Sequence, residues 1–187
     1  MKEAPKQTHC NLCGSEQYTL VHRRKKSLNA DTFSDKPEKV VQCLSCKIVY
    51  AILKSESNRQ EVLYADLAVG PVNLREEKGL RTRARLILEK IAKYKKRGKL
   101  LEIGSGAGFF LDEAKKIGWE VRGVDLSEKA VSHCLKNLAI PIFKGTVVEA
   151  GLDERTFDVI VINDVIAQMK DPKSTLQEAR CVLKNDG

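Results

Sequence analysis

Four of the six cysteines occur as two Cys-x-x-Cys pairs, a spacing that is typical of a metal site. Cys10 and Cys13 form the first pair, Cys43 and Cys46 form the second, and 29 residues separate them. Two such turns can complete the tetrahedral set of four thiolates that Zn²⁺ prefers. Gly14 follows the first pair and can adopt the positive φ that such a turn often uses. Because four thiolates leave no coordination position for water, the sequence predicts a structural zinc ion rather than a catalytic one.

A glycine-rich turn is the second place where the residue types point to chemistry. Gly104, Gly106 and Gly108 lie between an apolar run that predicts a strand and a pattern that predicts a helix. The glycines let the backbone approach a ligand closely, and the helix N-terminus points its free N–H groups there. Asp125 closes the next predicted strand, 23 residues after Glu102, where a carboxylate can accept hydrogen bonds from both hydroxyls of a ribose. The combination predicts a site for a cofactor that contains a nucleoside.

A dinucleotide such as NAD is the obvious competitor for this turn. Its fingerprint is G-x-G-x-x-G, but the sixth position here is Phe109, and the glycines follow a G-x-G-x-G pattern. An acidic residue, Glu102, precedes the first glycine by two positions. The pattern therefore favours a different nucleoside-bearing cofactor.

Three zones of the chain must position these residues. Residues 1–53 hold both cysteine pairs and short β-type runs, which predict a small zinc-ribbon β domain. Residues 54–98 are expected to be a linker followed by a basic amphipathic helix. Residues 99–187 alternate strand and helix patterns, which predict an α/β fold with a Rossmann-like parallel sheet. In such a sheet, ligands bind at the carboxyl ends of the strands.

Individual elements follow from local patterns. In the first zone, strands are predicted at residues 17–22, 39–42 and 48–53. The helix of the second zone carries an apolar stripe of Leu80, Ala84, Ile87, Leu88 and Ile91 and is expected to end at residues 95–98, where cations precede a glycine. In the third zone, strands are predicted at 99–103, 120–124, 140–143 and 157–162, with helices at 109–117, at 127–138 and from Asp171-Pro172 onward.

The order and spacing of these motifs resemble the class I S-adenosylmethionine-dependent methyltransferases. The family's first motif reads like residues 102–108, and the match continues through Val124-Asp125, the strand from Phe157 and the helix from Asp171. It covers about residues 75–187. The resemblance implies an enzyme that methylates an oxygen or carbon atom of a small molecule such as a sugar, a lipid or another metabolite.

The same resemblance implies a role for each residue near the turn. The three glycines would carry the backbone along the methionine part of S-adenosylmethionine, and Glu102 would reach toward its amino group. Asp125 would hold the ribose, and Leu126, Thr146 and Val147 would contact the adenine, although the family often has Asp at the position of Thr146. Asn163 and Asp164 would face the methyl group. The full set of expected cofactor contacts is Glu102, Gly104, Gly106, Gly108, Asp125, Leu126, Thr146, Val147, Asn163 and Asp164.

Simpler structural roles are alternatives for several of these residues. Gly108 could serve only to let two helices pack closely, and Asp125 could cap a helix. Asp158 is expected to be a strand-edge or turn carboxylate rather than a ligand. For Asn163 and Asp164, a structural role and a ligand role are both open.

The sequence does not identify a catalytic residue. Many small-molecule methyltransferases carry Glu-His shortly after the fourth strand, where this chain has Ala167 and Gln168. Methyl transfer from a sulfonium relies heavily on proximity and orientation, so a general base is not always needed. A module that binds the cofactor without transferring its methyl group is the alternative that follows.

The number of strands leads to a further expectation. The family's sheet has seven strands, and this chain supplies four before its last residue, Gly187. Residues 159–162 would then form an exposed, apolar edge strand, which proteins normally avoid. We therefore expect a fragment of a longer protein, or a second copy or partner chain that covers this edge.

The distribution of charge bears on a nucleic-acid alternative. The net charge of +8 divides into +4 over residues 1–62, +7 over residues 63–99 and −3 over residues 100–187. An RNA methyltransferase would use residues 23–26 together with Arg81, Arg83 and Arg85 to contact phosphates. Few aromatic residues accompany these charges, so base stacking is not expected, and a solvated helix face is the favoured interpretation.

Composition and the N-terminal residues predict a cytoplasmic protein. With 42% hydrophobic and 31% charged residues, the chain is neither disordered nor a coiled-coil rod. No apolar run approaches the roughly 20 residues of a membrane span, and the N-terminus has no secretory signal. In a reducing compartment the cysteines are not expected to form disulfides, and Cys134 and Cys181 are expected to be ordinary thiols.

Overall fold

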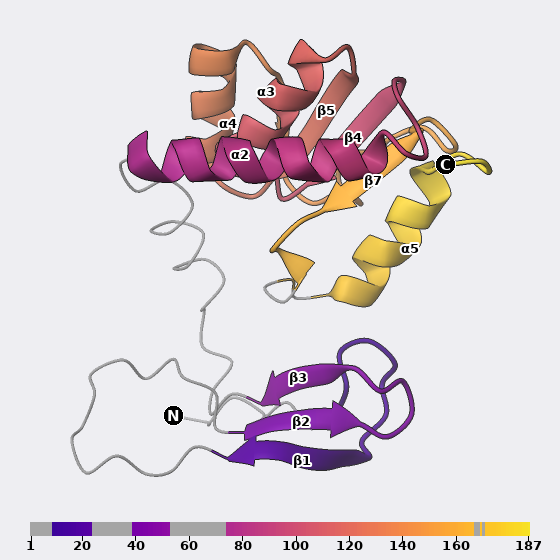
Figure 1. Ribbon diagram of the computed structural model, residues 1–187. Coiled ribbons are helices and arrows are strands. Elements are labelled where there is room, and N and C mark those ends of the chain that lie inside the picture. Colours follow the sequence, from indigo (N-terminus) through magenta and orange to yellow (C-terminus); the bar gives the residue numbers. More distant parts are fainter. Residues whose placement is uncertain (1–8, 24–38, 53–73, 167–168, 170) are drawn as a thin grey trace. The chain divides into compact units, whose positions relative to one another are not determined.

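The computed structural model describes residues 9–23, 39–52, 74–166, 169 and 171–187. They belong to two compact units, an N-terminal unit that extends to residue 59 and a second unit that comprises most of residues 60–187 (Figure 1). Ala167, Gln168, residues 24–38 and residues 53–73 lie outside the described part, so the interpretations placed on them stay predictions. None of the helices within the described ranges is long and apolar enough to cross a lipid bilayer.

The N-terminal unit contains a three-stranded antiparallel sheet, as predicted. Its strands are β1 (Tyr18–Arg23), β2 (Lys39–Cys43) and β3 (Val49–Ile52), in the order β1-β2-β3. Each strand begins and ends within one residue of its predicted limits. Val41 and Ile52 are the buried aliphatic residues of the described part of this unit, and the other buried apolar side chains there are Cys10 and Cys43. Cysteines therefore make up half of a very small core.

The second unit contains a parallel sheet of four strands, which confirms the predicted fold class. The strands are β4 (Lys99–Ile103), β5 (Glu120–Asp125), β6 (Ile142–Lys144) and β7 (Val159–Ile162), in the order β6-β5-β4-β7. The chain adds β5 and β6 on one side of β4 and then crosses to the other side for β7. The strand order reverses between β4 and β7, and in parallel sheets ligands bind at the carboxyl ends of the strands beside such a reversal.

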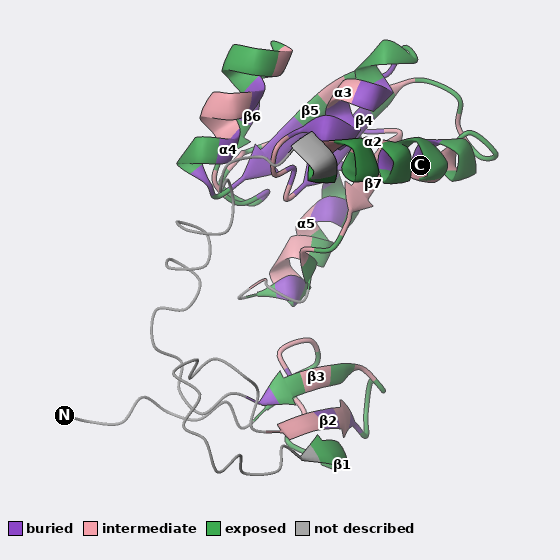
Figure 2. Ribbon diagram, turned by 60° about the vertical axis from the view of Figure 1, so that its left-hand side comes forward, coloured by how far each residue is buried: buried purple, intermediate pink, exposed green. Residues whose placement is uncertain are grey.

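Helices cover both faces of this sheet (Figures 1 and 2). They are α2 (Leu74–Ile91), α3 (Phe109–Lys116), α4 (Glu128–His133), the short π-helix η1 (Cys134–Leu138) that continues α4, and α5 (Pro172–Val182). Ala84 and Leu88 of α2 share one core with Leu100, whereas Ala179 of α5 shares the other core with Leu101. Neighbouring residues of a strand point to opposite faces, so β4 contributes to both cores. The basic helix is therefore an integral part of this unit.

α2 differs from its predicted form in two respects. It ends at Ile91, before the predicted end at residues 95–98, because the N–H groups of Lys93 and Tyr94 donate to carbonyl oxygens only three residues earlier. Leu80 was predicted on the buried stripe but is 47% exposed. The stripe that packs on the sheet is narrower than predicted and centres on Ala84 and Leu88.

Gly98, which was predicted to end the helix, instead makes room for a carboxylate. Its φ is +137°, and a Cβ atom there would lie 2.4 Å from Oδ2 of Asp158. The Asp158 carboxylate accepts hydrogen bonds from the Lys99 N–H (2.8 Å) and from Nζ of Lys184 (2.8 Å). These contacts hold the start of β4 near the end of the chain and confirm the predicted structural role of Asp158.

Two strands start later than predicted. β6 begins at Ile142 rather than at Ile140, because Pro141 has no N–H group to donate to a neighbouring strand. β7 begins after Phe157, which instead forms an isolated parallel bridge with Leu183. In each case one residue causes the delay: Pro141 lacks a backbone donor, and Phe157 pairs with Leu183 instead of with β4.

β7 is the edge strand that the sequence predicted. Among the described residues it pairs with β4 and has no partner on its other side. All four of its side chains are partly exposed. The apolar strand is therefore only half covered in this chain.

Candidate functional site

The glycine turn connects the end of β4 to the start of α3. The N–H groups of Gly104 and Ser105 both donate to the carbonyl oxygen of Val124 at 2.9 and 3.2 Å. The N–H of Gly108 donates to the carbonyl oxygen of Ser105 at 2.9 Å. These bonds tie the turn to the carboxyl end of β5, next to the point where the strand order reverses.

The three glycines of the turn have positive φ values but different surroundings. A Cβ atom at Gly104 would lie 2.7 Å from the Val165 side chain, and one at Gly108 would lie 2.5 Å from Sγ of Cys134. At Gly106, with φ +50°, nothing lies within 4 Å of the Cβ position. Gly106 therefore leaves open space where a ligand can meet the backbone. At Gly108, the alternative of close packing against η1 has direct geometric support.

Gly108→Ala is expected to destabilise the second unit by about 3 kcal/mol or more, because left-handed strain and a clash with Cys134 add together. Gly151 has a similar φ of +54° but open space around its Cβ position. Gly151→Ala is the matched control and should cost only the strain, about 1 to 2 kcal/mol. Urea unfolding measures both changes, and equal losses of stability would contradict the packing role of Gly108.

Both carboxylate oxygens of Asp125 accept backbone hydrogen bonds, one of them from the glycine turn. Oδ2 accepts a hydrogen bond from the Gly106 N–H at 2.7 Å, and Oδ1 accepts one from the Ser127 N–H at 2.9 Å. The helix-cap role belongs to Ser127, whose hydroxyl accepts the Ala130 N–H at 3.2 Å, as predicted. Each carboxylate oxygen of Asp125 keeps a further lone pair that can accept a hydroxyl group. The neighbouring Leu126 is 42% exposed and can lie against an apolar ring.

Glu102 is a buried carboxylate whose hydrogen bonds are incomplete. Its residue is 4% exposed, and Oε2 has no hydrogen-bond partner among the described residues. Burial raises the pKa of Glu102 well above its usual range, and the nearby Asp125 charge raises that pKa further. An unpaired buried oxygen is costly, so this position calls for a donor that the described residues do not supply. The ammonium group of an amino-acid ligand meets that need.

Glu102→Gln is expected to flatten the dependence of stability on pH. The pKa of Glu102 is higher in the folded chain than in the unfolded chain, so the folded state holds this proton to higher pH. The stability linked to it is fully present below about pH 4.5 and is lost as the pH rises toward the folded pKa. Urea unfolding at several pH values should show that the free energy of unfolding falls less with rising pH for the variant than for the wild type. Identical pH profiles would contradict the raised pKa.

Thr146 and Val147 follow β6 and face different surroundings. The backbone N–H and the hydroxyl of Thr146 both donate to Oε2 of Glu149, and the Glu149 N–H donates back to the Thr146 hydroxyl oxygen. The Gly145 N–H donates to the backbone carbonyl oxygen of Asp125 at 2.9 Å and ties this turn to β5. The Val147 side chain is 1% exposed and lies in the core beneath α5. Only the backbone of Val147 can therefore meet a ligand.

Asn163 and Asp164 follow β7 at the same edge of the sheet as the glycine turn. Ile162 of β7 pairs in register with Ile103 of β4, so the residues after both strands are neighbours. Asp164 has a φ of +56° and forms an ion pair with Nη1 of Arg83 at 2.5 Å. The two side chains are 65% and 53% exposed. Arg83 therefore reaches the methionine end of the predicted site, whereas the sequence predicted for it only a solvated helix face or a phosphate contact.

Two further arginines of α2 also form ion pairs. Arg81 contacts Asp112 and Glu113 of α3, and Arg85 contacts Glu113. The Arg81 side chain is 17% exposed, whereas that of Arg85 is 60% exposed and still reaches solvent. The RNA-binding alternative for this helix therefore stays a prediction. Residues 24–26 lie outside the described part.

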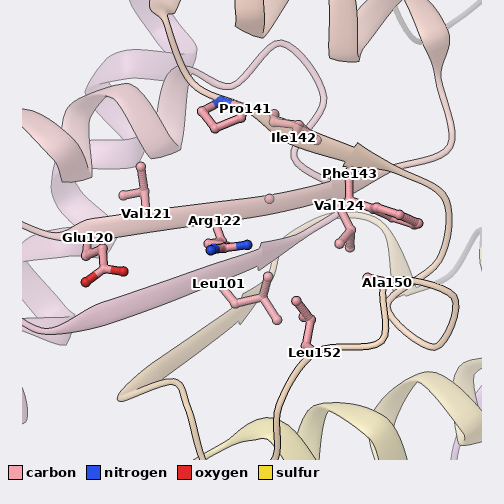
Figure 3. A pocket seen from close by; sticks show the side chains of 11 residues that line it. Leu101, Glu120, Val121, Arg122, Val124, Pro141, Ile142, Phe143, Ala150 and Leu152 are labelled. Carbon is pink, nitrogen blue, oxygen red and sulfur yellow. The ribbon is translucent and has the colours of Figure 1, made fainter.

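A cavity of about 510 Å³ lies along the face of the sheet between β4 and β6 (Figure 3). Apolar side chains such as Leu101, Phe143 and Leu152 form much of its wall, and Arg122 lies among them. None of the predicted cofactor residues lines this cavity. The cavity is therefore separate from the glycine turn.

The four paired cysteines lie together in the N-terminal unit. Their sulfur atoms are all within 4.8 Å of one another; Sγ of Cys10 is 3.7 Å from Sγ of Cys46, and Sγ of Cys13 is 3.5 Å from Sγ of Cys43. A tetrahedral ion with Zn–S bonds of about 2.3 Å requires sulfur separations of about 3.8 Å. The backbone N–H of Cys46 lowers the pKa of Cys43 to about 6, whereas burial and the neighbouring Cys13 thiol raise the pKa of Cys46 to about 12. All six cysteines of the chain are free thiols.

The two cysteine turns have the same backbone form. The Gly14 N–H donates to the Cys10 carbonyl oxygen at 2.8 Å, and the Lys47 N–H donates to the Cys43 carbonyl oxygen at 3.1 Å. Gly14 and Lys47 have φ values of +77° and +64°. Gly14 made the turn at the first pair predictable from the sequence. At the second pair Lys47 adopts the same positive φ, which its residue type does not predict. Cys134 is buried beside the glycine turn and Cys181 is exposed, so neither belongs to this cluster.

Residues 101–187 match the protein family described as a methyltransferase domain. A ubiquinone biosynthesis O-methyltransferase from Actinobacillus pleuropneumoniae is 28% identical over 99 residues, which cover 48% of this chain and 42% of the relative. The matched region therefore spans less than half the length of that curated relative.

Two solved structures share the fold. A protein from Pyrococcus horikoshii is 27% identical with a TM-score of 0.51, and the match covers 67% of this chain and 59% of that one. An S-adenosylmethionine-dependent methyltransferase from Archaeoglobus fulgidus is 23% identical with a TM-score of 0.50, with 58% of this chain and 48% of that one covered. Together with the family match, these structures confirm the predicted class I fold.

Proposed function

We propose, from the premise that residues 101–187 match the methyltransferase domain family, that this chain binds S-adenosylmethionine and transfers its methyl group to a small molecule. The observation that carries the proposal is the unsatisfied Oε2 of Glu102, buried at the end of β4 beside the glycine turn. A ligand with a cationic amino group supplies the missing donor. The open backbone at Gly106 and the carboxylate of Asp125 suit the rest of the same molecule.

The residues of the site divide the cofactor among them. Glu102 accepts the amino group, Gly104 and Gly106 lie along the methionine chain, and Asp125 accepts the ribose hydroxyls. Leu126 and the backbone after β6 border the adenine. When bound, S-adenosylmethionine supplies an electrophilic methyl group on a sulfonium. The contribution of the chain is to hold the reactive end near Asn163 and Asp164 in a fixed orientation, which is the main requirement of an in-line displacement.

The acceptor in this proposal is an oxygen or carbon atom of a small molecule such as a sugar, a lipid or another metabolite. The name of the Actinobacillus relative, an O-methyltransferase, supports an oxygen acceptor. Asn163 and Asp164 directly follow β7, and the methyl group is expected to lie beside them. Ala167 and Gln168, where related enzymes carry a base, lie outside the described residues, and we assign no catalytic residue.

We also infer that the four cysteine sulfurs of the N-terminal unit hold one structural Zn²⁺. The sulfur separations and the tight turns support this ion, because both agree with a closed tetrahedral site. Elemental analysis of the purified chain should find about one zinc per molecule. A folded N-terminal unit without metal would contradict the inference.

Calorimetric titration of the chain with S-adenosylmethionine and S-adenosylhomocysteine tests the proposed function. We expect both ligands to bind one site and NAD to give no binding heat. Transfer is then measured as radiolabelled methyl incorporated into phenolic, sugar and carbon-acid acceptors. Binding without transfer to any of these would support the non-catalytic alternative. If neither sulfur ligand binds, the proposed function is wrong for this chain.

A further inference from the structure

Arg81 of α2 contacts several residues at the start of α3. Nη1 of Arg81 lies 2.5 Å from Oδ2 of Asp112 and 2.8 Å from Oε1 of Glu113, and Nε lies 2.7 Å from Oε1 of Glu77. The Arg81 guanidinium also lies over the Phe109 ring, 4.7 Å from its centroid. The side chain is only 17% exposed. Arg81 therefore joins its own helix to the first two turns of α3.

The start of α3 matters because it directly follows the glycine turn. Gly108 is the N-cap of α3 and provides no side-chain hydrogen bond to the first N–H groups. Those groups stay available to a ligand, but a side-chain cap is not present to fix where they point. The ring of Phe109, the first residue of α3, contacts both the Arg81 guanidinium and the His133 ring, whose centroid lies 6.0 Å from its own. The anchor that a cap would supply thus comes from α2 and α4.

The charges around Arg81 form a balanced network. Arg81, Arg85 and Lys116 face Glu77, Asp112 and Glu113. The Glu113 side chain is 7% exposed, and its three cationic neighbours, Arg85 first, lower its pKa to about 2. Arg81, Asp112 and Glu113 are the least exposed members, and charges this close hold a defined geometry when all of them are paired. Figure 1 shows α2 beside α3, where this network joins them.

We propose that Arg81 is a positioning residue for the cofactor turn: through Phe109 and Asp112 it orients the start of α3, and with it the N–H groups after Gly104 and Gly106. The inference rests on the proposed function for its ligand. Arg85 provides a matched comparison, because it contacts α3 through Glu113 alone and its side chain is 60% exposed. Removal of Arg85 takes the same charge from the same network without touching Phe109 or Asp112.

The test compares Arg81→Gln, Arg81→Lys and Arg85→Gln. We expect Arg81→Gln to raise the dissociation constant of S-adenosylhomocysteine about tenfold or more, because it removes the stacked cation and the Asp112 contact together. Arg81→Lys keeps the charge but not the planar stacking, so its affinity for S-adenosylhomocysteine should lie between those of Arg81→Gln and the wild type. Arg85→Gln should stay within about twofold of the wild type. Both Gln variants are expected to lower the melting temperature.

Two readouts separate a positioning role from a purely stabilising one. If Arg81→Gln and Arg85→Gln weaken binding equally, or if Arg81→Gln lowers only the melting temperature, the proposal is overturned. In ligand-free protein, the amide NMR signals of Gly104, Gly106 and Gly108 should shift in the Arg81 variants but not in Arg85→Gln. This second readout does not depend on the cofactor, so it tests Arg81 even if the wild type fails to bind S-adenosylhomocysteine.

Discussion

Asp125→Ala is expected to weaken the binding of S-adenosylmethionine and S-adenosylhomocysteine at least about 100-fold, since hydrogen bonds to a charged group contribute about 1.5 to 3 kcal/mol each. The substitution removes the acceptor for the ribose hydroxyls. It also frees the Gly106 and Ser127 N–H groups, which Asp125 holds at 2.7 and 2.9 Å. Loss of the Gly106 bond loosens the middle of the glycine turn, while the bonds from Gly104 and Ser105 to the Val124 carbonyl oxygen still hold its start to β5. Calorimetry measures the change.

Asp153→Ala is the matched control for this prediction. Asp153 is an exposed carboxylate in the same unit and makes none of the described contacts with the glycine turn. Its removal changes the net charge by the same amount and should leave both affinities within about twofold. Asp125→Asn keeps one oxygen acceptor, so its affinities should lie between those of Asp125→Ala and Asp153→Ala. Equal affinities for Asp125→Ala and the wild type would place the nucleoside elsewhere.

Removal of the proposed zinc ion is expected to unfold the N-terminal unit while the second unit stays folded. The described part of the N-terminal unit buries Val41 and Ile52 together with Cys10 and Cys43, so hydrophobic burial alone cannot hold it. Structural zinc sites contribute about 10 to 16 kcal/mol of apparent binding energy, which is folding energy in such units. Chelation should collapse the amide NMR signals of residues 10–22 and 39–52 to the unfolded range and leave those of residues 99–187 unchanged.

Cys43→Ser should reproduce the effect of the chelator, because three remaining thiolates bind zinc much more weakly. Cys181→Ser is the matched control, since Cys181 is an exposed thiol outside the cluster. That variant should keep a full zinc content and an unchanged spectrum. A well-dispersed set of signals for residues 39–52 after complete removal of the metal would contradict a zinc-dependent fold.

The strands and helices of the second unit were predictable because each has a local cause. Alternation of apolar strands with helical patterns predicted the parallel sheet, Ser127 predicted the start of α4, and Pro172 predicted the start of α5. Errors occurred where a single residue overrides the pattern. Pro141 delays β6, and Gly98 accommodates the Asp158 carboxylate instead of ending α2.

The contacts that the sequence could not predict join residues far apart in the chain. Arg81 meets Asp112 across 31 positions, and Arg83 meets Asp164 across 81. Helical periodicity placed both arginines on a polar face, where a solvated interpretation was reasonable. Only the packing of α2 beside α3 and beside the residues after β7 shows that these charges are paired. The incomplete hydrogen bonding of Glu102 likewise appears only when its surroundings are known.

The central claim is that S-adenosylmethionine binds at the glycine turn, and residue-specific amide NMR during titration with S-adenosylhomocysteine tests it most directly. We predict saturable shifts of the signals of Gly104, Gly106, Leu126 and Thr146, with no comparable shifts when NAD is added. Signals around the cavity near Arg122 should stay in place. Shifts confined to that cavity, or no shifts at the glycine turn at saturating ligand, would contradict the account.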